Sequence, residues 1–168
     1  MSELLEAVYR EHRQGLYSLA VTITASHQLA EDAVHNAFAR MIRTVQPEQA
    51  NLVPYVYRSV RNAAIDLCRK DQVRRRVSTA LFASYQANDS KRSIDPTQEM
   101  MTKETHQQLR ETIDALPENY REAIVLKAFA GLTFQQIGLI TETSPKTIAT
   151  RYRRAIEELH SRLLKQLY

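Results

Sequence analysis

Two short helical segments separated by a tight break occupy residues 132–163, near the C-terminal end of the chain. The break covers residues 141–143, and the second segment opens at Ser144-Pro145. A serine hydroxyl can accept a hydrogen bond from a free amide at a helix N-terminus. Proline fits the first helical position because its missing N–H has no partner there. This start signal restricts the region to two helices joined by a sharp turn.

The second segment is amphipathic. Its apolar residues recur at steps of three or four and predict one buried face, formed by Ile148, Tyr152, Ala155, Leu159 and Leu163. The opposite face carries Lys146, Thr147, Thr150, Arg153, Arg154 and Glu157. A helix pair whose second member presents bases and hydroxyls to solvent has the layout of a helix-turn-helix, which places that helix in the major groove of DNA. An ordinary helical hairpin with a solvated charged face fits the same pattern.

The composition of the whole chain favours an all-α fold. Glycine occurs only three times, alternation of β-branched residues is almost absent, and Leu, Ala, Gln, Glu and Arg dominate. In the first half, helical periodicity predicts helices at about residues 3–24, 28–45 and 54–76, which can form one compact bundle. The third of these is expected to bury Val56, Val60, Ala63, Ala64 and Leu67.

Residues 77–100 lose this periodicity and include a polar, turn-rich stretch, so we predict a flexible linker there. A helix over residues 97–116 and further helices after Pro117 follow. The predicted architecture is two small helical domains, residues 1–76 and residues 101–168, with the helix-turn-helix in the second domain.

Basic residues gather in two places, and the chain has a formal net charge of +4. One cluster comprises Arg69, Lys70, Arg74, Arg75 and Arg76, and the other comprises Lys146, Arg151, Arg153 and Arg154. Two separated basic clusters suit a polyanion that is contacted at two places. A solvated surface is the alternative for each cluster taken alone.

Several function classes find no support in the sequence. Cys68 is the only cysteine, so neither an intramolecular disulfide nor a cysteine-based zinc site is possible, and the five histidines lack ligand spacing. With no glycine-rich phosphate loop and no nucleophile–base motif, we expect no catalytic residue, metal or cofactor. No apolar run reaches membrane length, and the acidic start does not resemble a signal peptide. These features predict a cytoplasmic protein without membrane insertion.

The order of several segments resembles a known family. The C-terminal segments 116–123, 131–137, 144–148 and 151–155 are similar to the DNA-binding domain of a bacterial sigma factor. The N-terminal segments 16–20, 30–38 and 57–70 are similar to the core-binding and promoter-melting domain of the same family. The compact extracytoplasmic-function (ECF) group of the sigma-70 family fits best. The resemblance covers nearly the whole chain except the linker, and the order of the segments is more specific than any one of them.

This resemblance implies a non-enzymatic subunit that binds core RNA polymerase and directs transcription to promoters. Residues 1–76 would correspond to sigma region 2 and residues 101–168 to sigma region 4. The expected partners are core RNA polymerase and promoter DNA. Two small domains on a linker also suggest an anti-sigma factor that clamps them shut.

The helix at 28–45 carries a polar stripe suited to pairing with a charged partner helix. We expect Phe38 to face the core, with Val34, Met41, Ile42 and Val45 near it. The resemblance implies that the polar face docks on the clamp helices of the largest polymerase subunit. The candidate polymerase-binding residues are Asp32, His35, Asn36, Arg40 and Arg43. A solvated face is the alternative.

The outer face of the helix at 54–76 combines aromatic, amide and basic side chains, as a reader of single-stranded DNA requires. By resemblance this face, with the loop at 46–53, would melt the minus-ten promoter element and hold a flipped base. The candidate residues are Tyr55, Arg58, Arg61, Asn62, Asp66, Arg69 and Lys70. Tyr55 and Tyr57 are equally compatible with a core position, and Asp66 can instead pair with Arg69 or Lys70.

By resemblance the second helix of the pair reads the minus-thirty-five element. Its candidate residues are Ser144, Lys146, Thr147, Thr150, Arg151, Arg153 and Arg154. The chain departs from the common family pattern at several positions. The family commonly has Gln-Glu at His35-Asn36, glycine at Glu142, alanine near Gly138 and lysine at Ala149. We expect these changes to alter promoter preference and polymerase affinity more than the fold, since a non-glycine residue at a left-handed position costs about 1 kcal/mol.

Two other classes of protein remain open at this point. The first is a helix-turn-helix regulator whose N-terminal domain dimerises or senses a ligand. The second is a helical scaffold with no role at DNA, which would make the two matching halves coincidental. Binding of core polymerase by the first half would distinguish a sigma factor from both.

Overall fold

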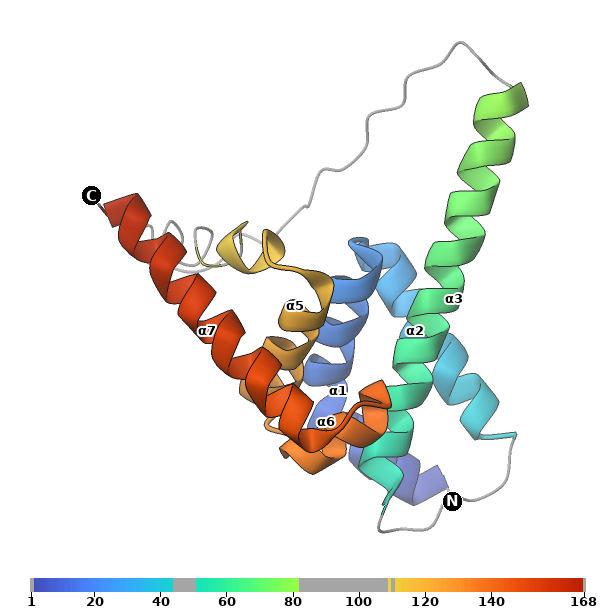
Figure 1. Cartoon of the computed structure of the whole chain (residues 1–168). Coiled ribbons are helices and arrows are strands. Elements are labelled where there is room, and N and C mark those ends of the chain that lie inside the picture. The colour runs from blue at the N-terminus through green and yellow to red at the C-terminus, as the bar shows by residue number, and fades with distance from the viewer. Residues whose placement is uncertain (1, 44–50, 82–108, 110, 168) are drawn as a thin grey trace, which may run out of the picture.

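The structure, a computed structural model, describes residues 2–43, 51–81, 109 and 111–167 (Figure 1). The helices are α1 (Ser2–Thr24), α2 (His27–Met41), α3 (Leu52–Leu81), α5 (Glu118–Ile124), α6 (Phe134–Thr141) and α7 (Pro145–Leu167), with a π-helical turn, η2 (Val125–Phe129). No strand occurs among the described residues, which confirms the all-α prediction over that part of the chain. Helix α3 continues past Arg76 to Leu81, and the rest of the predicted linker lies outside the described residues.

Helices α1, α2 and α3 pack against one another and form the N-terminal half. Leu16, Leu19 and Ala20 of α1 are fully buried. As predicted for α3, Val56, Val60, Ala63 and Ala64 are buried, while Leu67 is half-buried. The predicted bundle is therefore present.

The core face of α2 differs from the prediction. Its buried residues are Ala30, Ala33, Ala37 and Met41. Phe38 and Val34 are only partly buried, and Ile42 is 63% exposed. Only Met41 of the predicted apolar set lies in the core, and Val45 lies outside the described residues. Alanines on the inner face let α2 approach its neighbours closely, which moves the larger side chains to its flank.

In the C-terminal half, α5 and α7 pack around Leu116, Ile124, Ala155 and Leu159. Ile148 is also buried, so most of the predicted inner face of α7 is confirmed. Tyr152 and Leu163 lie at its margin and are half-buried.

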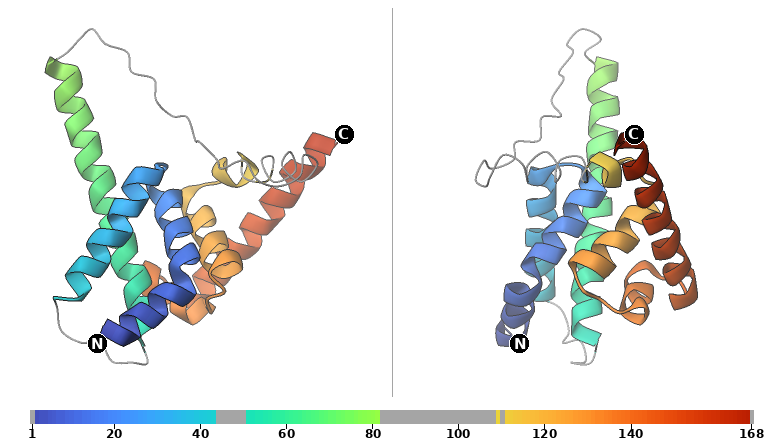
Figure 2. Two further views of the ribbon diagram at one scale, coloured as in Figure 1. Left: turned by 180° about the vertical axis from the view of Figure 1, so that it is seen from behind. Right: turned by 90° about the vertical axis from the view of Figure 1, so that its left-hand side faces the viewer.

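The two halves are in direct contact. Helix α6 packs on α3, while α5 and η2 pack on α1 (Figure 2). One continuous cluster of buried residues contains Leu16 and Tyr57 from the first half together with Leu126 and Leu132 from the second. Gly15 permits this approach, because a Cβ there would overlap Tyr57 Oη and lie 3.0 Å from the Cβ of Ala130.

Among the described residues, no helix is both long and apolar enough to cross a membrane.

Candidate nucleic-acid interface

The turn between α6 and α7 is fixed by local hydrogen bonds. Helix α6 begins with a capping box, in which Thr133 Oγ1 accepts from the Gln136 N–H at 3.1 Å and Gln136 Oε1 accepts from the Thr133 N–H at 2.9 Å. Helix α7 begins as predicted, with Ser144 Oγ accepting from the Thr147 N–H at 3.1 Å and Pro145 as the first helical residue.

Glu142 ends α6 in the left-handed conformation, with φ 54° and ψ 39°. The glycine that makes this turn possible lies four residues earlier, in α6. The carbonyl oxygen of Gly138 accepts the Thr143 N–H at 3.0 Å, and a Cβ on Gly138 would lie 2.7 Å from the carbonyl oxygen of Thr143. A side chain at position 138 would therefore push the turn, and α7 with it, away from α6.

A basic depression of about 350 Å³ lies between α5 and the first turns of α7. Its lining residues from α7 are Lys146, Thr147, Thr150, Arg151 and Arg154. Thr150 Oγ1 donates to the carbonyl oxygen of Lys146 at 3.0 Å, while Lys146 and Arg154 are exposed. The depression thus offers cations and hydroxyls in one concave surface, which suits a phosphate backbone and base edges.

Helix α3 presents a second polar face. Its exposed members are Tyr55, Arg58, Asn62, Asp66, Arg69 and Lys70. Tyr57, by contrast, is fully buried, and burial raises the pKa of its hydroxyl above the ordinary value. Of the two tyrosines, Tyr57 is the core residue and Tyr55 the accessible one.

Two arginines of α3 are engaged by the C-terminal half. Arg61 Nε lies 2.8 Å from Oε1 of Glu122, and Arg61 Nη2 lies 3.3 Å from Oε2 of the same carboxylate. Arg58 forms an ion pair with Glu142, at the end of α6. The Arg61 pair is largely buried, whereas both members of the Arg58 pair are exposed.

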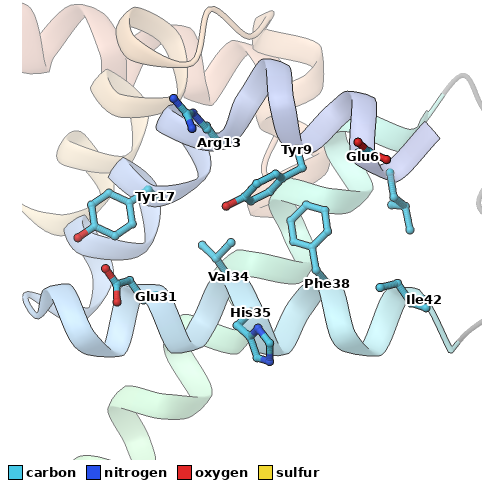
Figure 3. Close-up of a pocket in the computed structure, with 10 residues that line it drawn as sticks. Glu6, Tyr9, Arg13, Tyr17, Glu31, Val34, His35, Phe38 and Ile42 are labelled. Carbon is cyan, nitrogen blue, oxygen red and sulfur yellow. The ribbon is translucent and has the colours of Figure 1, made fainter. Parts of the chain in front are cut away.

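A third surface lies along α2. The side chains of Asp32, His35, Asn36, Arg40 and Arg43 are all exposed. His35 borders a groove of about 430 Å³ between α1 and α2, lined by apolar side chains and rimmed by charged ones (Figure 3). Tyr9 and Phe38 meet edge to face in this groove, with ring centroids 5.2 Å apart.

Two protein-family models match the chain in order. The model described as sigma-70 region 2 matches residues 8–74, and the model described as sigma-70, region 4 matches residues 106–159. Together they account for most of the sequence. The chain belongs to the sigma-70 family.

The curated proteins that this sigma factor resembles include members of the ECF group. It is 27% identical over 163 residues to the ECF RNA polymerase sigma factor SigE of Mycolicibacterium smegmatis, covering 95% of this chain and 62% of that protein. It is 26% identical over 162 residues to the ECF RNA polymerase sigma factor SigM of Bacillus subtilis, covering 94% and 96% of the two chains.

A solved structure shares the fold. The sigma factor RpoE of Bartonella quintana, crystallised in complex with the anti-sigma factor NepR, superimposes with a TM-score of 0.70. The match covers 98% of each chain at 20% sequence identity. At this identity the likeness concerns the fold alone.

The structure brings most of the predicted α7 residues of this sigma factor together and adds two from α5. Asn119 and Tyr120 line the same basic depression but were not among the residues selected from the sequence. Both residues follow Pro117 at the start of the short helix α5. This position is the sequence signal from which they could have been selected. Arg153 lies outside the depression, where its Nε is 3.9 Å from Oε1 of Glu157.

Among the described residues of this sigma factor, no group of three or more His, Cys, Asp or Glu side chains could hold a metal ion. Cys68 is half-buried, and its thiol donates to the carbonyl oxygen of Ile23 at 3.5 Å. Burial raises the pKa of this thiol, and the negative charges of Asp71 and Glu118 raise it further.

Proposed function

We propose that this chain binds core RNA polymerase and directs promoter-specific transcription initiation through DNA recognition and promoter melting. The observation that carries the proposal is the presence of sigma-70 regions 2 and 4, in that order, in a single chain. A sigma factor does no covalent chemistry of its own, so no catalytic residue is assigned. A protein with this task works where the chromosome lies, and we therefore place it in the cytoplasm.

The proposed reader of the minus-thirty-five element is the N-terminal part of α7. Arg151 and Arg154 line the basic depression and can contact guanine edges or phosphates, while Lys146 sets the register through the backbone. Ser144 lies outside the lining of the depression, where its Oγ caps α7 and lies 2.7 Å from Oγ1 of Thr147, which does line the depression. Asn119 joins this set from α5.

The proposed minus-ten surface is the outer face of α3. Tyr55 is 36% exposed and can stack on an unpaired base, and Asn62 can bond a base edge. Arg69 and Lys70 supply cations for the backbone, with Arg58 and Arg61 nearer the start of the helix.

The proposed polymerase dock is the exposed polar face of α2, formed by Asp32, His35, Asn36, Arg40 and Arg43. Mixed charges on one helical face suit pairing with a charged helix of the polymerase. The Bartonella relative was crystallised with an anti-sigma factor, which supports proposing a partner of that kind here as well.

The decisive experiment is transcription in vitro with purified core polymerase on fragmented genomic DNA. We expect the chain to co-purify with core polymerase and to produce discrete start sites that core enzyme alone does not produce. The helix-turn-helix regulator, which no observation favours, predicts DNA binding without polymerase association. Absence of any polymerase association would overturn the proposal.

Single substitutions separate the two proposed roles. Arg154→Ala should weaken binding to a double-stranded upstream element about 5–150-fold, in line with about 1–3 kcal/mol for one specific arginine contact, and leave polymerase binding intact. Asp32→Ala should do the reverse. Arg10→Ala and Glu11→Ala, exposed changes on α1, are the matched controls. If Arg154→Ala and Asp32→Ala reduce both activities equally, the assignment of the surfaces is wrong.

A further inference from the structure

Thr150 lines the basic depression, and its hydroxyl is already bonded to its own helix. Its Oγ1 donates to the carbonyl oxygen of Lys146 at 3.0 Å, one turn earlier in α7. A threonine hydroxyl has one hydrogen and two lone pairs. Because the hydrogen is used by the backbone, Oγ1 has only lone pairs left for a ligand in the depression. Thr150 therefore acts as a hydrogen-bond acceptor at this point of α7.

The hydroxyl of Thr147, in the same depression, is not fixed in this way. Its Oγ1 lies 2.7 Å from Oγ of Ser144, and either oxygen can be the donor. Ser144 Oγ also accepts the Thr147 N–H at 3.1 Å. Of the two hydroxyl hydrogens, one lies between the oxygens and the other is free. Thr147 is thus able to donate or to accept, whereas Thr150 accepts.

Two cations flank Thr150 on the same face of α7. Lys146 precedes it by four residues and Arg154 follows it by four, and residues with this spacing are neighbours on a helix surface. Both cationic side chains are exposed, whereas Thr150 is half-buried. Contacts of such cations to phosphate set position and carry no sequence information. The uncharged Thr150 between them is therefore suited to choosing a base rather than to raising the affinity for every sequence.

The four bases differ in what their major-groove edges offer to an acceptor. Adenine N6 and cytosine N4 carry amino hydrogens, whereas guanine presents O6 and N7 and thymine presents O4. An acceptor oxygen therefore bonds adenine or cytosine, and it meets a second acceptor at guanine or thymine. Each base pair contains one amino base on this side, so the choice concerns which strand carries it.

Resting on the proposed function, we propose that Thr150 determines sequence specificity in the minus-thirty-five element. It selects adenine or cytosine over guanine or thymine at one position of the strand that α7 contacts. Thr150 Oγ1 accepts from the amino group of the base while its own hydrogen stays on the Lys146 carbonyl oxygen. To bond guanine or thymine, the hydroxyl would have to leave that carbonyl oxygen. The net value of one hydrogen bond corresponds to about 2–12-fold in affinity, which is the expected size of the preference.

Three variants separate the hydroxyl from the shape of the side chain. Thr150→Val replaces Oγ1 by a methyl group and keeps the branching at Cβ. Thr150→Ser keeps the hydroxyl and its reach to the Lys146 carbonyl oxygen, and it removes the methyl group. Thr147→Val is the matched control, because it removes from the same depression a hydroxyl whose donor role is not fixed. Neither position lies in the core, so thermal unfolding and assembly with core polymerase should match wild type in all three variants.

The probe is a promoter duplex identified by transcription in vitro, in which one helical turn at the minus-thirty-five element is randomised. The full chain, assembled with core polymerase, captures this library, and the bound duplexes are sequenced. We expect wild type to enrich adenine and cytosine about 2–12-fold over guanine and thymine at one position of one strand. Thr150→Ser should keep this preference, Thr150→Val should abolish it, and Thr147→Val should leave it unchanged.

Several results would overturn the role of Thr150. The first is the same base frequencies in wild type and Thr150→Val. The second is a preference for guanine or thymine that disappears in Thr150→Val, since the hydroxyl would then be a donor. Loss of the preference in Thr150→Ser would assign it to the shape of the side chain, and loss in Thr147→Val would assign it to the start of α7. Failure of the wild-type chain to assemble with core polymerase is a different result, because it overturns the sigma-factor proposal itself.

Discussion

Helices α7 and α3 both carry arginines suited to DNA, and the two helices differ in what surrounds those arginines. The Arg153 side chain on α7 is 71% exposed, and Arg154 beside it is also exposed. The Arg61 side chain on α3 is 23% exposed and faces a buried carboxylate from another helix. A basic helical face in a sequence thus indicates what a helix can bind, but not whether that face is open.

The physical reason for this difference is how far apart in the sequence the contacting residues lie. The basic depression on α7 is built from its own first turns and the neighbouring start of α5. The partners of Arg58 and Arg61 lie 84 and 61 residues further along the chain. Local contacts form whenever the C-terminal half folds, whereas the contacts of α3 exist only while both halves are docked.

The largest expected effect is a difference in stability between two variants, one that loses Arg61 of α3 and one that loses Arg154 of α7. Arg61→Ala should lower the free energy of unfolding by up to about 3–5 kcal/mol, because it leaves the Glu122 carboxylate buried without a cation. Separation of the halves, which hydrates Glu122, sets the upper limit of this loss. Arg154→Ala should change stability by no more than about 0.5 kcal/mol. Urea denaturation followed by circular dichroism measures both. Equal stability of the two variants would remove the distinction between α3 and α7.

A second prediction concerns the turn that orients α7. Gly138→Ala should destabilise the C-terminal half by about 1–3 kcal/mol, because the new Cβ would meet the Thr143 carbonyl oxygen at 2.7 Å. We expect it to weaken duplex binding by α7 and to leave oligodeoxythymidine binding by α3 no weaker than in wild type. Thermal unfolding and anisotropy provide the two readouts.

The substitution Glu142→Gly should have the opposite effect on stability to Gly138→Ala. It relieves the left-handed strain at position 142, where φ is 54°, and should stabilise the turn by up to about 1 kcal/mol. A Gly138→Ala variant as stable as wild type would mean that the turn can shift without cost, and that α7 is less firmly oriented than its hydrogen bonds indicate.

The smallest expected effect is on the reactivity of Cys68. Burial raises the pKa of its thiol, and the charges of Asp71 and of Glu118, which belongs to the C-terminal half, raise it further. Below the pKa, a raised pKa means less thiolate and slower alkylation. Separation of the two halves moves Glu118 away from Cys68. The pKa of the thiol then falls, and the rate of its alkylation at pH 7–8 rises. Ala130→Leu places a larger side chain against Gly15, where the two halves touch. Iodoacetamide labelling of wild type and Ala130→Leu should show a modest acceleration in the variant, and identical rates at every pH would argue against separation near Cys68.

Prediction from the sequence succeeded for features that depend only on residues within one segment. The start of α7 at Ser144-Pro145 and its buried face at Ile148, Ala155 and Leu159 were predicted from local signals. The left-handed end of α6 at Glu142 was expected only from the family resemblance. Hydrogen-bonded caps and helical periodicity depend on residues within a few positions of one another, so the sequence alone is sufficient for them.

Sequence reasoning failed where the side-chain pattern allowed two solutions. The pattern of α2 suggested a core face built on Phe38 and Ile42, but α2 turns its alanines inward and leaves Phe38 to pack against Tyr9 at the surface. Periodicity identifies two apolar flanks on this helix and does not say which flank faces the neighbours. Close packing against α1 and α3 decided that.

The sequence by itself determined that this protein is helical, where its helix-turn-helix begins, and to which family it belongs. Only the tertiary structure determined that Arg58 and Arg61 meet Glu142 and Glu122, that Tyr57 is a core residue, and that Asn119 joins the basic depression. Helix formation is encoded over a few residues, whereas the partner of a charged side chain across two halves depends on how the completed helices pack.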